Sequence, residues 1–174
     1  MAQDNNNTYM NITYRQMINT FEDIATNHHE IHSFNSGSLN DVDLEKYDLS
    51  KFPLMYVEPE PVSVDAQTLT YSFTVIIADQ IQEDMTGLND AYSETLLILK
   101  DVIANFVQAT QTSSWADQRT DLEMPIQLSP FTSRFSNMLT GWAGTFNIVC
   151  QNQNNLCNVP QTNNTEWLIL QTFV

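Results

Sequence analysis

Positive charge is scarce in this sequence. Its 174 residues include six Lys and Arg against 21 Asp and Glu, so the formal net charge is -15 at pH 7. Binding to DNA phosphates or to anionic lipid needs clustered cations, and six across the whole chain cannot form the usual patch. We therefore expect neither DNA nor a membrane surface as a bound ligand. DNA that slides past without sticking is compatible with this charge, because like charges repel within a Debye length of about 8 Å.

Glycine and cysteine are also scarce. With four glycines, the chain has hardly the material for a phosphate-binding loop, and it contains no GxSxG, P-loop or GxGxxG pattern. Cys150 and Cys157 are separated by six residues and belong to no CxxC pair. We expect two reduced thiols, with a disulfide as the less favoured alternative. The sequence thus predicts a protein that is not an enzyme and uses no cofactor.

Long apolar runs are absent as well. The longest fall far below the roughly 18 residues that would span a bilayer. The opening residues, "MAQDNNNTYMN", have neither the basic start nor the apolar stretch of a signal peptide. From these residues we expect no export and no membrane anchor.

The chain does contain the material for a hydrophobic core. Hydrophobic residues make up 42% of it, with nine Phe, six Tyr and three Trp. A single domain of this length can bury about 70% of the surface that its unfolded chain exposes. The sequence therefore predicts one domain with a core of its own.

Two segments have the apolar spacing of amphipathic helices. The first runs from Thr8 to about Asn27, and the second covers residues 86 to 110 with Asn89 as its expected N-cap. The predicted buried faces are Met10, Tyr14, Met17, Ile18, Phe21, Ile24 and Ala25 in the first, and Tyr92, Leu96, Leu97, Leu99, Val102, Ile103, Phe106 and Val107 in the second.

Alternation of apolar and polar residues predicts strands between and after these helices. Residues 52 to 58 form the first, and residues 62 to 64 lead into a longer partner that ends near Asp79. A strand interrupted by Pro125 follows the second helix, and residues 28 to 37 form a connection or a short strand. A further strand over residues 141 to 150 places on one face Trp142, Gly144, Phe146, Ile148 and Cys150.

This order of elements predicts an α+β fold. We expect a mostly antiparallel sheet with two helices packed on one face. Residues 1 to 150 form the domain, and residues 151 to 174 form a C-terminal loop followed by a strand-like arm, "EWLILQTFV".

The stretch "FPLMYVEPEPVSV" is the most distinctive local feature. Pro59 and Pro61 cannot donate hydrogen bonds to a strand ladder, so we expect them at the tip of a hairpin. Glu58 and Glu60 would keep this tip charged and hydrated. The hairpin is then predicted to project towards a neighbouring subunit or a channel.

Two motifs superficially resemble metal sites. In "HHEIH", His28 and His32 are four residues apart and would share a helical face, but the motif is not HExxH. "DVDLE" resembles the start of a calcium loop, but Lys46 stands where glycine is expected and Phe52 where a bidentate glutamate is required. We expect a polar helix exit and a hydrated acidic loop, and no metal site.

The succession "FPLMYVEPEPVSV", "LTYSFTVIIAD", "DAYSETLLILKDVIANF" and "LSPFTSRFSNMLTGWAGTFNIV" resembles small structural proteins of the neck and tail of tailed bacteriophages. The resemblance is to those of crAss-like phages and other phages of Bacteroidetes in particular. It covers roughly residues 10 to 150. "FPLMYVEP", "SETLLILKDVI" and "SPF...GW" are its most specific parts, and none of them is a catalytic motif.

The resemblance implies a virion protein like a tail terminator or tail-completion protein, a head-tail connector that assembles in the host cytoplasm. Such subunits form sixfold or twelvefold homo-oligomeric rings between the portal and the tail, and DNA passes through the channel without specific binding. Candidate interface residues are Glu58, Pro59, Glu60, Pro61, Arg134, Trp167, Leu168 and Phe173. Arg134 lies between two phenylalanines and could pair with a carboxylate of another subunit, or it could be an ordinary hydrated arginine.

A second hypothesis needs no ring. A monomeric acidic binding module, or an assembly chaperone that does not stay in the virion, would have the same composition. Its absence from finished particles would distinguish it from a ring subunit. A metal-dependent enzyme that uses His28 and His32 is the third and least favoured hypothesis.

Overall fold

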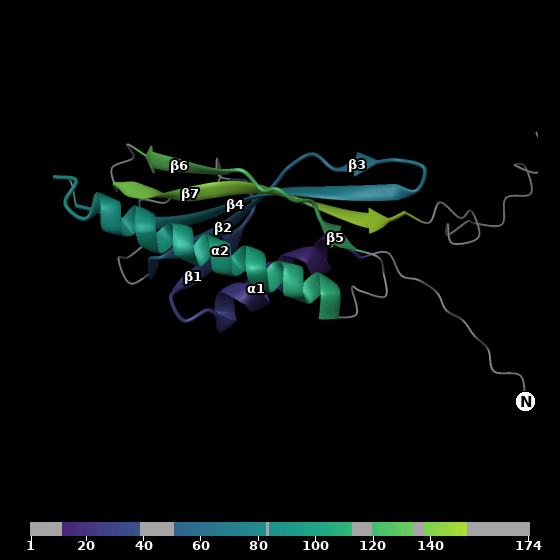
Figure 1. Ribbon diagram of the computed structural model, residues 1–174, viewed down its shortest axis with the longest axis horizontal. Helices are drawn as coiled ribbons and strands as arrows, with labels where there is room; N and C mark the ends of the chain where they lie inside the picture. Colours follow the sequence, from purple (N-terminus) through teal and green to yellow (C-terminus); the bar gives the residue numbers. More distant parts are fainter. Residues whose placement is uncertain (1–11, 39–50, 83, 113–119, 134–137, 153–174) are drawn as a thin grey trace, which may run out of the picture.

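The computed structural model describes residues 12–38, 51–82, 84–112, 120–133 and 138–152. The predicted α+β fold is confirmed. Two helices, α1 and α2, lie together on one face of a mixed, mostly antiparallel seven-stranded sheet (Figure 1).

Helix α1 spans Tyr14–Asn27 and begins with a capping box. The side chain of Gln16 accepts a hydrogen bond from the backbone N–H of Thr13 at 2.8 Å, and the Thr13 hydroxyl accepts one from the N–H of Gln16 at 3.3 Å. The predicted start at Thr8 is wrong, because Thr13 has extended backbone angles and caps the helix. The burial of Met17, Phe21 and Ala25 confirms the predicted apolar face at these positions, Tyr14 is exposed, and Met10 lies outside the described residues.

Helix α2 spans Leu88–Thr112. Asn89 lies inside the helix and is not its cap, since the N–H of Ala91 already donates to the carbonyl of Gly87 at 2.9 Å. The predicted stripe is right for most positions and wrong for Leu97, whose side chain is 56% exposed. Ile98 is buried instead, because each residue turns the helix by about 100° and the face towards the sheet passes through Ile98 and Val102.

The sheet is built around two long central strands. Strand β4 (Thr68–Gln80) and strand β7 (Leu139–Gln151) pair antiparallel along their whole length, from Thr68 opposite Gln151 to Gln80 opposite Leu139. On one side of β4 lie β2 (Leu54–Pro59) and β3 (Ser63–Val64), and β1 (Ser33–Ser36) pairs parallel with β2 beyond it. On the far side of β7 lie β5 (Asp121–Leu122) and β6 (Leu128–Ser133).

The alternation of β7 is as predicted. Phe146, Ile148 and Cys150 are buried in the core on the helix side, and Trp142 packs against that core. The indole N–H of Trp142 donates to the carbonyl of Tyr92 at 2.9 Å, which ties β7 to α2. Gly144, also on this face, leaves room for the side chains of neighbouring residues, because an added Cβ would lie 2.6 Å from Leu128.

An aromatic cluster forms the centre of the core. Phe21 of α1 stacks on Phe106 of α2, with ring centroids 4.7 Å apart. It also meets Phe73 and Phe146 of the sheet edge-on, at 5.5 Å and 5.8 Å. One side chain therefore joins both helices to both central strands.

A smaller cluster on the opposite face of the sheet contains Phe52, Leu54, Ala78 and Leu139. In the described parts of the chain, no helix is long and apolar enough to cross a membrane.

Candidate interaction surface

The proline pair lies in an edge of the sheet and not at a hairpin tip. Pro59 pairs with Phe73 of β4, and the N–H of Glu60 still donates to the carbonyl of Ser72 at 2.9 Å. Pairing resumes with Ser63 opposite Thr70, so residues 60 to 62 face only residues 71 and 72. One extra residue in one strand is a β-bulge.

The predicted hairpin tip is therefore wrong in position. The turn lies beyond both prolines, where the N–H of Asp65 donates to the carbonyl of Thr68 at 2.8 Å. Residues 66 and 67 form this tip, and β3 with the start of β4 forms the hairpin. The chain can keep pairing through Pro59 because its nitrogen does not face β4. In an antiparallel ladder the backbone groups of successive residues point alternately towards and away from the neighbouring strand, and here the backbone N–H of Glu60 points towards β4.

The outward direction of Pro59 affects what this edge can bind. Strand β1 covers β2 only from Leu54 to Val57. Among the described residues, no strand pairs with the outer side of residues 59 to 64. An added strand would need N–H donors there, and Pro59 and Pro61 have none. This edge therefore resists strand addition, and any partner must bind through side chains.

Apolar side chains are exposed along this edge. Pro59 and Pro61 are exposed, Val62 and Val64 are 48% and 67% exposed, and Tyr14, which the sequence predicted to be buried, is 43% exposed. We call these five residues the edge patch. Pro59, Pro61, Val62 and Val64 follow one another along the strand edge, and the ring of Tyr14 lies 5.8 Å from that of Phe73, the residue opposite Pro59. Exposed apolar residues that gather in this way mark interaction surfaces.

The two glutamates lie beside the edge patch and face the other side of the sheet. The Glu60 carboxylate accepts a hydrogen bond from the Thr74 hydroxyl at 2.8 Å, so it folds back on β4 and does not extend into water. Glu58 lies opposite Thr74 and is half-buried. The prediction that these glutamates keep a hairpin tip hydrated is therefore wrong, although their role at an interface stays a prediction.

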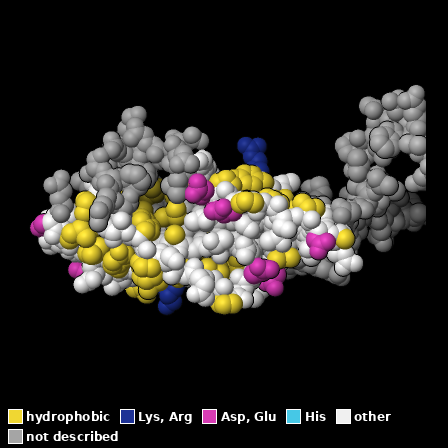
Figure 2. Space-filling model, turned by 90° about the horizontal axis from the view of Figure 1, so that it is seen from above, with side chains coloured by type: hydrophobic (Ala, Val, Ile, Leu, Met, Phe, Trp, Pro, Cys, Tyr) yellow, Lys and Arg dark blue, Asp and Glu magenta, His cyan; other side chains and the backbone are white. Residues whose placement is uncertain are grey.

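The sheet face away from the helices is polar over much of its length. The Ser72 hydroxyl donates to the Asn147 side-chain oxygen at 2.9 Å, and the amide of Asn147 donates to the Glu123 carboxylate at 3.2 Å. Figure 2 shows this face: hydrophobic side chains gather towards its left end, and acidic side chains are spread over it. Lys and Arg side chains project only at its outline in this view.

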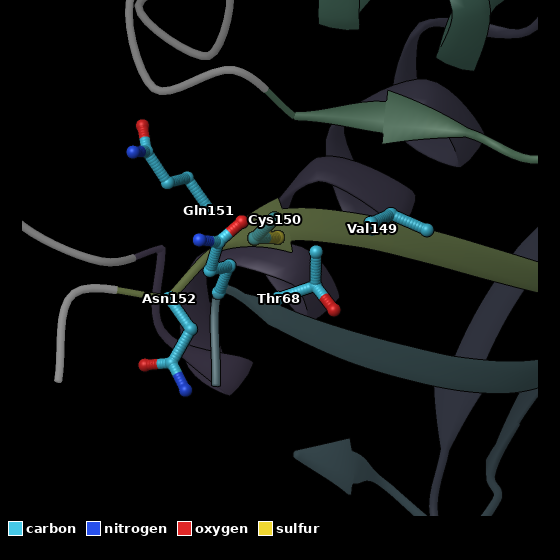
Figure 3. Close-up of a pocket in the computed structure, with 6 residues that line it drawn as sticks. Thr68, Val149, Cys150, Gln151 and Asn152 are labelled. Atoms are coloured by element: carbon cyan, nitrogen blue, oxygen red, sulfur yellow. The ribbon is translucent and has the colours of Figure 1, made fainter. Parts of the chain in front are cut away.

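A shallow pocket of about 420 Å³ lies at the end of the β4–β7 ladder (Figure 3). The amide side chains of Gln151 and Asn152 point in different directions and do not converge on one point. Cys150 is 2% exposed, and burial raises the pKa of its thiol, so it is a poor nucleophile. The pocket thus lacks the convergent polar groups of a catalytic site.

The two histidines of the motif are not arranged as a helical metal-binding pair. Helix α1 ends at Asn27 and His28 has extended backbone angles, so His28 and His32 do not share a helical face. The Nδ1 atom of His28 accepts from the N–H of Glu30 at 3.2 Å, and its Nε2 atom lies 3.5 Å from the Asp101 carboxylate. Among the described residues no group of three His, Cys, Asp or Glu side chains could hold a metal ion.

Several predicted sites lie outside the described residues. These are the "DVDLE" loop and the interface candidates Arg134, Trp167, Leu168 and Phe173. Cys157 and the C-terminal arm also lie outside them.

No protein-family model matches the chain, and no curated protein matches it.

Proposed function

We propose that this chain is a structural virion protein, a subunit of a homo-oligomeric ring in the neck or tail of a tailed bacteriophage of the crAss-like type. The ring would contain six or twelve copies and would connect portal-side and tail-side proteins around the DNA channel. The subunit would act by assembly and not by catalysis.

The edge patch is the observation that carries this proposal. Four apolar residues are exposed along a strand edge where two prolines exclude strand addition, and Tyr14 of α1 is exposed as well. Burying a valine or tyrosine side chain contributes about 1.5–3 kcal/mol, so leaving several in water needs a reason. A protein contact supplies that reason, and an assembling subunit presents such a contact in every copy.

The charge of the chain supports the same proposal. A formal net charge of -15 would keep the wall of a channel from binding the DNA that moves through it. The resemblance in sequence pattern to phage neck and tail proteins points in the same direction. Neck and tail proteins, including the portal, are the partners that we propose.

Mass spectrometry of purified virions tests this function. A ring subunit is expected at six or twelve copies per particle, counted against the major capsid protein with isotope-labelled peptides. An assembly chaperone or a free binding module would be abundant in infected cells and absent from particles. That result would refute the proposed function.

A further inference from the structure

A second exposed apolar surface lies on the opposite edge of the sheet. Glu123 still pairs through its N–H with the carbonyl of Asn147 at 2.9 Å, and pairing resumes with Leu128 opposite Gly144. Residues 124 to 127 therefore face only residues 145 and 146, so two extra residues bulge out of the ladder at this edge. Met124 is 62% exposed in this bulge, and Pro125 is exposed beside it. We call Met124 and Pro125 the bulge patch.

The Pro59 end of the edge patch and the bulge patch lie at the same level on opposite edges of the sheet, and Val64 lies four residues further along. Pro59 pairs with Phe73, Phe73 pairs with Phe146, and Met124 follows the residue that pairs with Asn147. One row across the sheet therefore runs from the edge patch to the bulge patch. Four strand positions spaced about 4.8 Å apart separate the patches by roughly 15 Å.

Prolines also block strand addition locally on both sides of the sheet. Pro130 of β6 lies opposite Trp142 of β7, and the backbone N–H and C=O groups of Trp142 point towards Ile77 of β4. The nitrogen of Pro130 therefore faces outward, as the nitrogen of Pro59 does on the other edge. Two copies that meet edge to edge cannot extend each other's ladders at these prolines, so their contact at these positions must consist of side chains.

We propose that the edge patch of one copy packs against the bulge patch of the next copy. This inference rests on the proposed ring and specifies its contact. Two different surfaces on opposite edges of one chain make a heterologous contact, and repeated heterologous contacts form a ring where the rotation between copies closes and an open filament where it does not. The partner is a second copy because the chain itself carries another exposed apolar surface on the opposite edge, level with Pro59. Ion pairs are a poor alternative in a chain with six Lys and Arg against 21 Asp and Glu.

Three full-length variants test this contact by native mass spectrometry and sedimentation. Val64→Glu places a charge in the edge patch, and Met124→Glu places one in the bulge patch. Leu97→Glu is the matched control. Leu97 lies on α2, and the exposed fraction of its side chain, 56%, is between those of Val64, 67%, and Val62, 48%. Val64→Glu and Met124→Glu are each expected to abolish rings, and Leu97→Glu is expected to retain them.

Mixing the two defective variants gives the sharpest result. Val64→Glu keeps a normal bulge patch, and Met124→Glu keeps a normal edge patch, so an equimolar mixture is expected to form heterodimers and no rings. Val64→Ser removes the same apolar surface without introducing a charge, so it serves as a second test in case the charged variant misfolds. It should weaken each contact about tenfold, since burial of a valine is worth about 1.5 kcal/mol. Circular dichroism and thermal unfolding of every variant verify the fold.

The outcomes distinguish this inference from the function on which it rests. Rings of wild-type protein that persist in folded Val64→Glu and Met124→Glu variants would overturn the inference and leave the ring function standing. A mixture that stays monomeric would also overturn it, because the two patches would then not bind each other. Wild-type protein that never assembles, alone or with neck proteins, would instead refute the ring function.

Discussion

Replacement of Phe21 by alanine tests whether the aromatic cluster holds the helices on the sheet. Phe21 is fully buried, stacks on Phe106 and meets Phe73 and Phe146 edge-on. Large-to-small substitution of a buried phenylalanine costs about 3–5 kcal/mol. Each aromatic pair adds about 0.5–1.5 kcal/mol beyond burial, so we expect Phe21→Ala near the upper end, at about 4–5 kcal/mol. A domain of this kind has about 5–15 kcal/mol in total.

Urea unfolding followed by circular dichroism measures this cost. Wild-type and variant must be compared at the same protein concentration, because assembly stabilises the folded chain by mass action. Leu97→Ala is the control, since its side chain is 56% exposed, and it should change the free energy of unfolding by less than about 0.5 kcal/mol. A cost below about 1 kcal/mol for Phe21→Ala would refute the packing described here.

Three further predictions follow from single residues. Gly141→Ala should lower the free energy of unfolding by about 1–3 kcal/mol or more in urea titrations, because its Cβ would overlap the carbonyl of Ile77. Burial raises the pKa of the Asp79 carboxyl above its usual 3.8, so its ionised form destabilises the folded state. Asp79→Asn should stabilise the fold at pH 7, with a gain that shrinks on acidification towards pH 4; an equal gain at both pH values would contradict this. In a Cys157→Ser background, Cys150 should react with iodoacetamide about 100-fold more slowly in the folded than in the urea-unfolded chain, since it is buried.

Elements with regular local patterns could be predicted from the sequence. The face of β7 and the core positions of α1 were predictable because each element is covered on one side, which imposes a period of two or of about 3.6. Because the four residues from Leu96 to Leu99 are all apolar, they do not specify by themselves which side of the helix faces the core. Whether Leu97 or Ile98 faces the core depends on where the sheet lies, and this choice was predicted wrongly.

Features that depend on pairing between distant segments could not be predicted in this way. Pro59 and Pro61 have the composition of a turn, but β4 continues past them and pairs with β3 beyond the bulge. Local propensity does not reveal that the nitrogen of Pro59 faces outward. The exposure of Tyr14 likewise depends on where α1 starts relative to the sheet. The edge patch therefore became visible only when the register was known.

The mass of the assembled wild-type chain tests the ring most directly. Native mass spectrometry of the full-length protein, alone and with adjoining neck proteins, should show species of six or twelve times the 19.9 kDa chain. Electron micrographs of the same sample should show closed rings with a central hole. Only 19.9 kDa monomers at micromolar concentrations under both conditions would contradict the account.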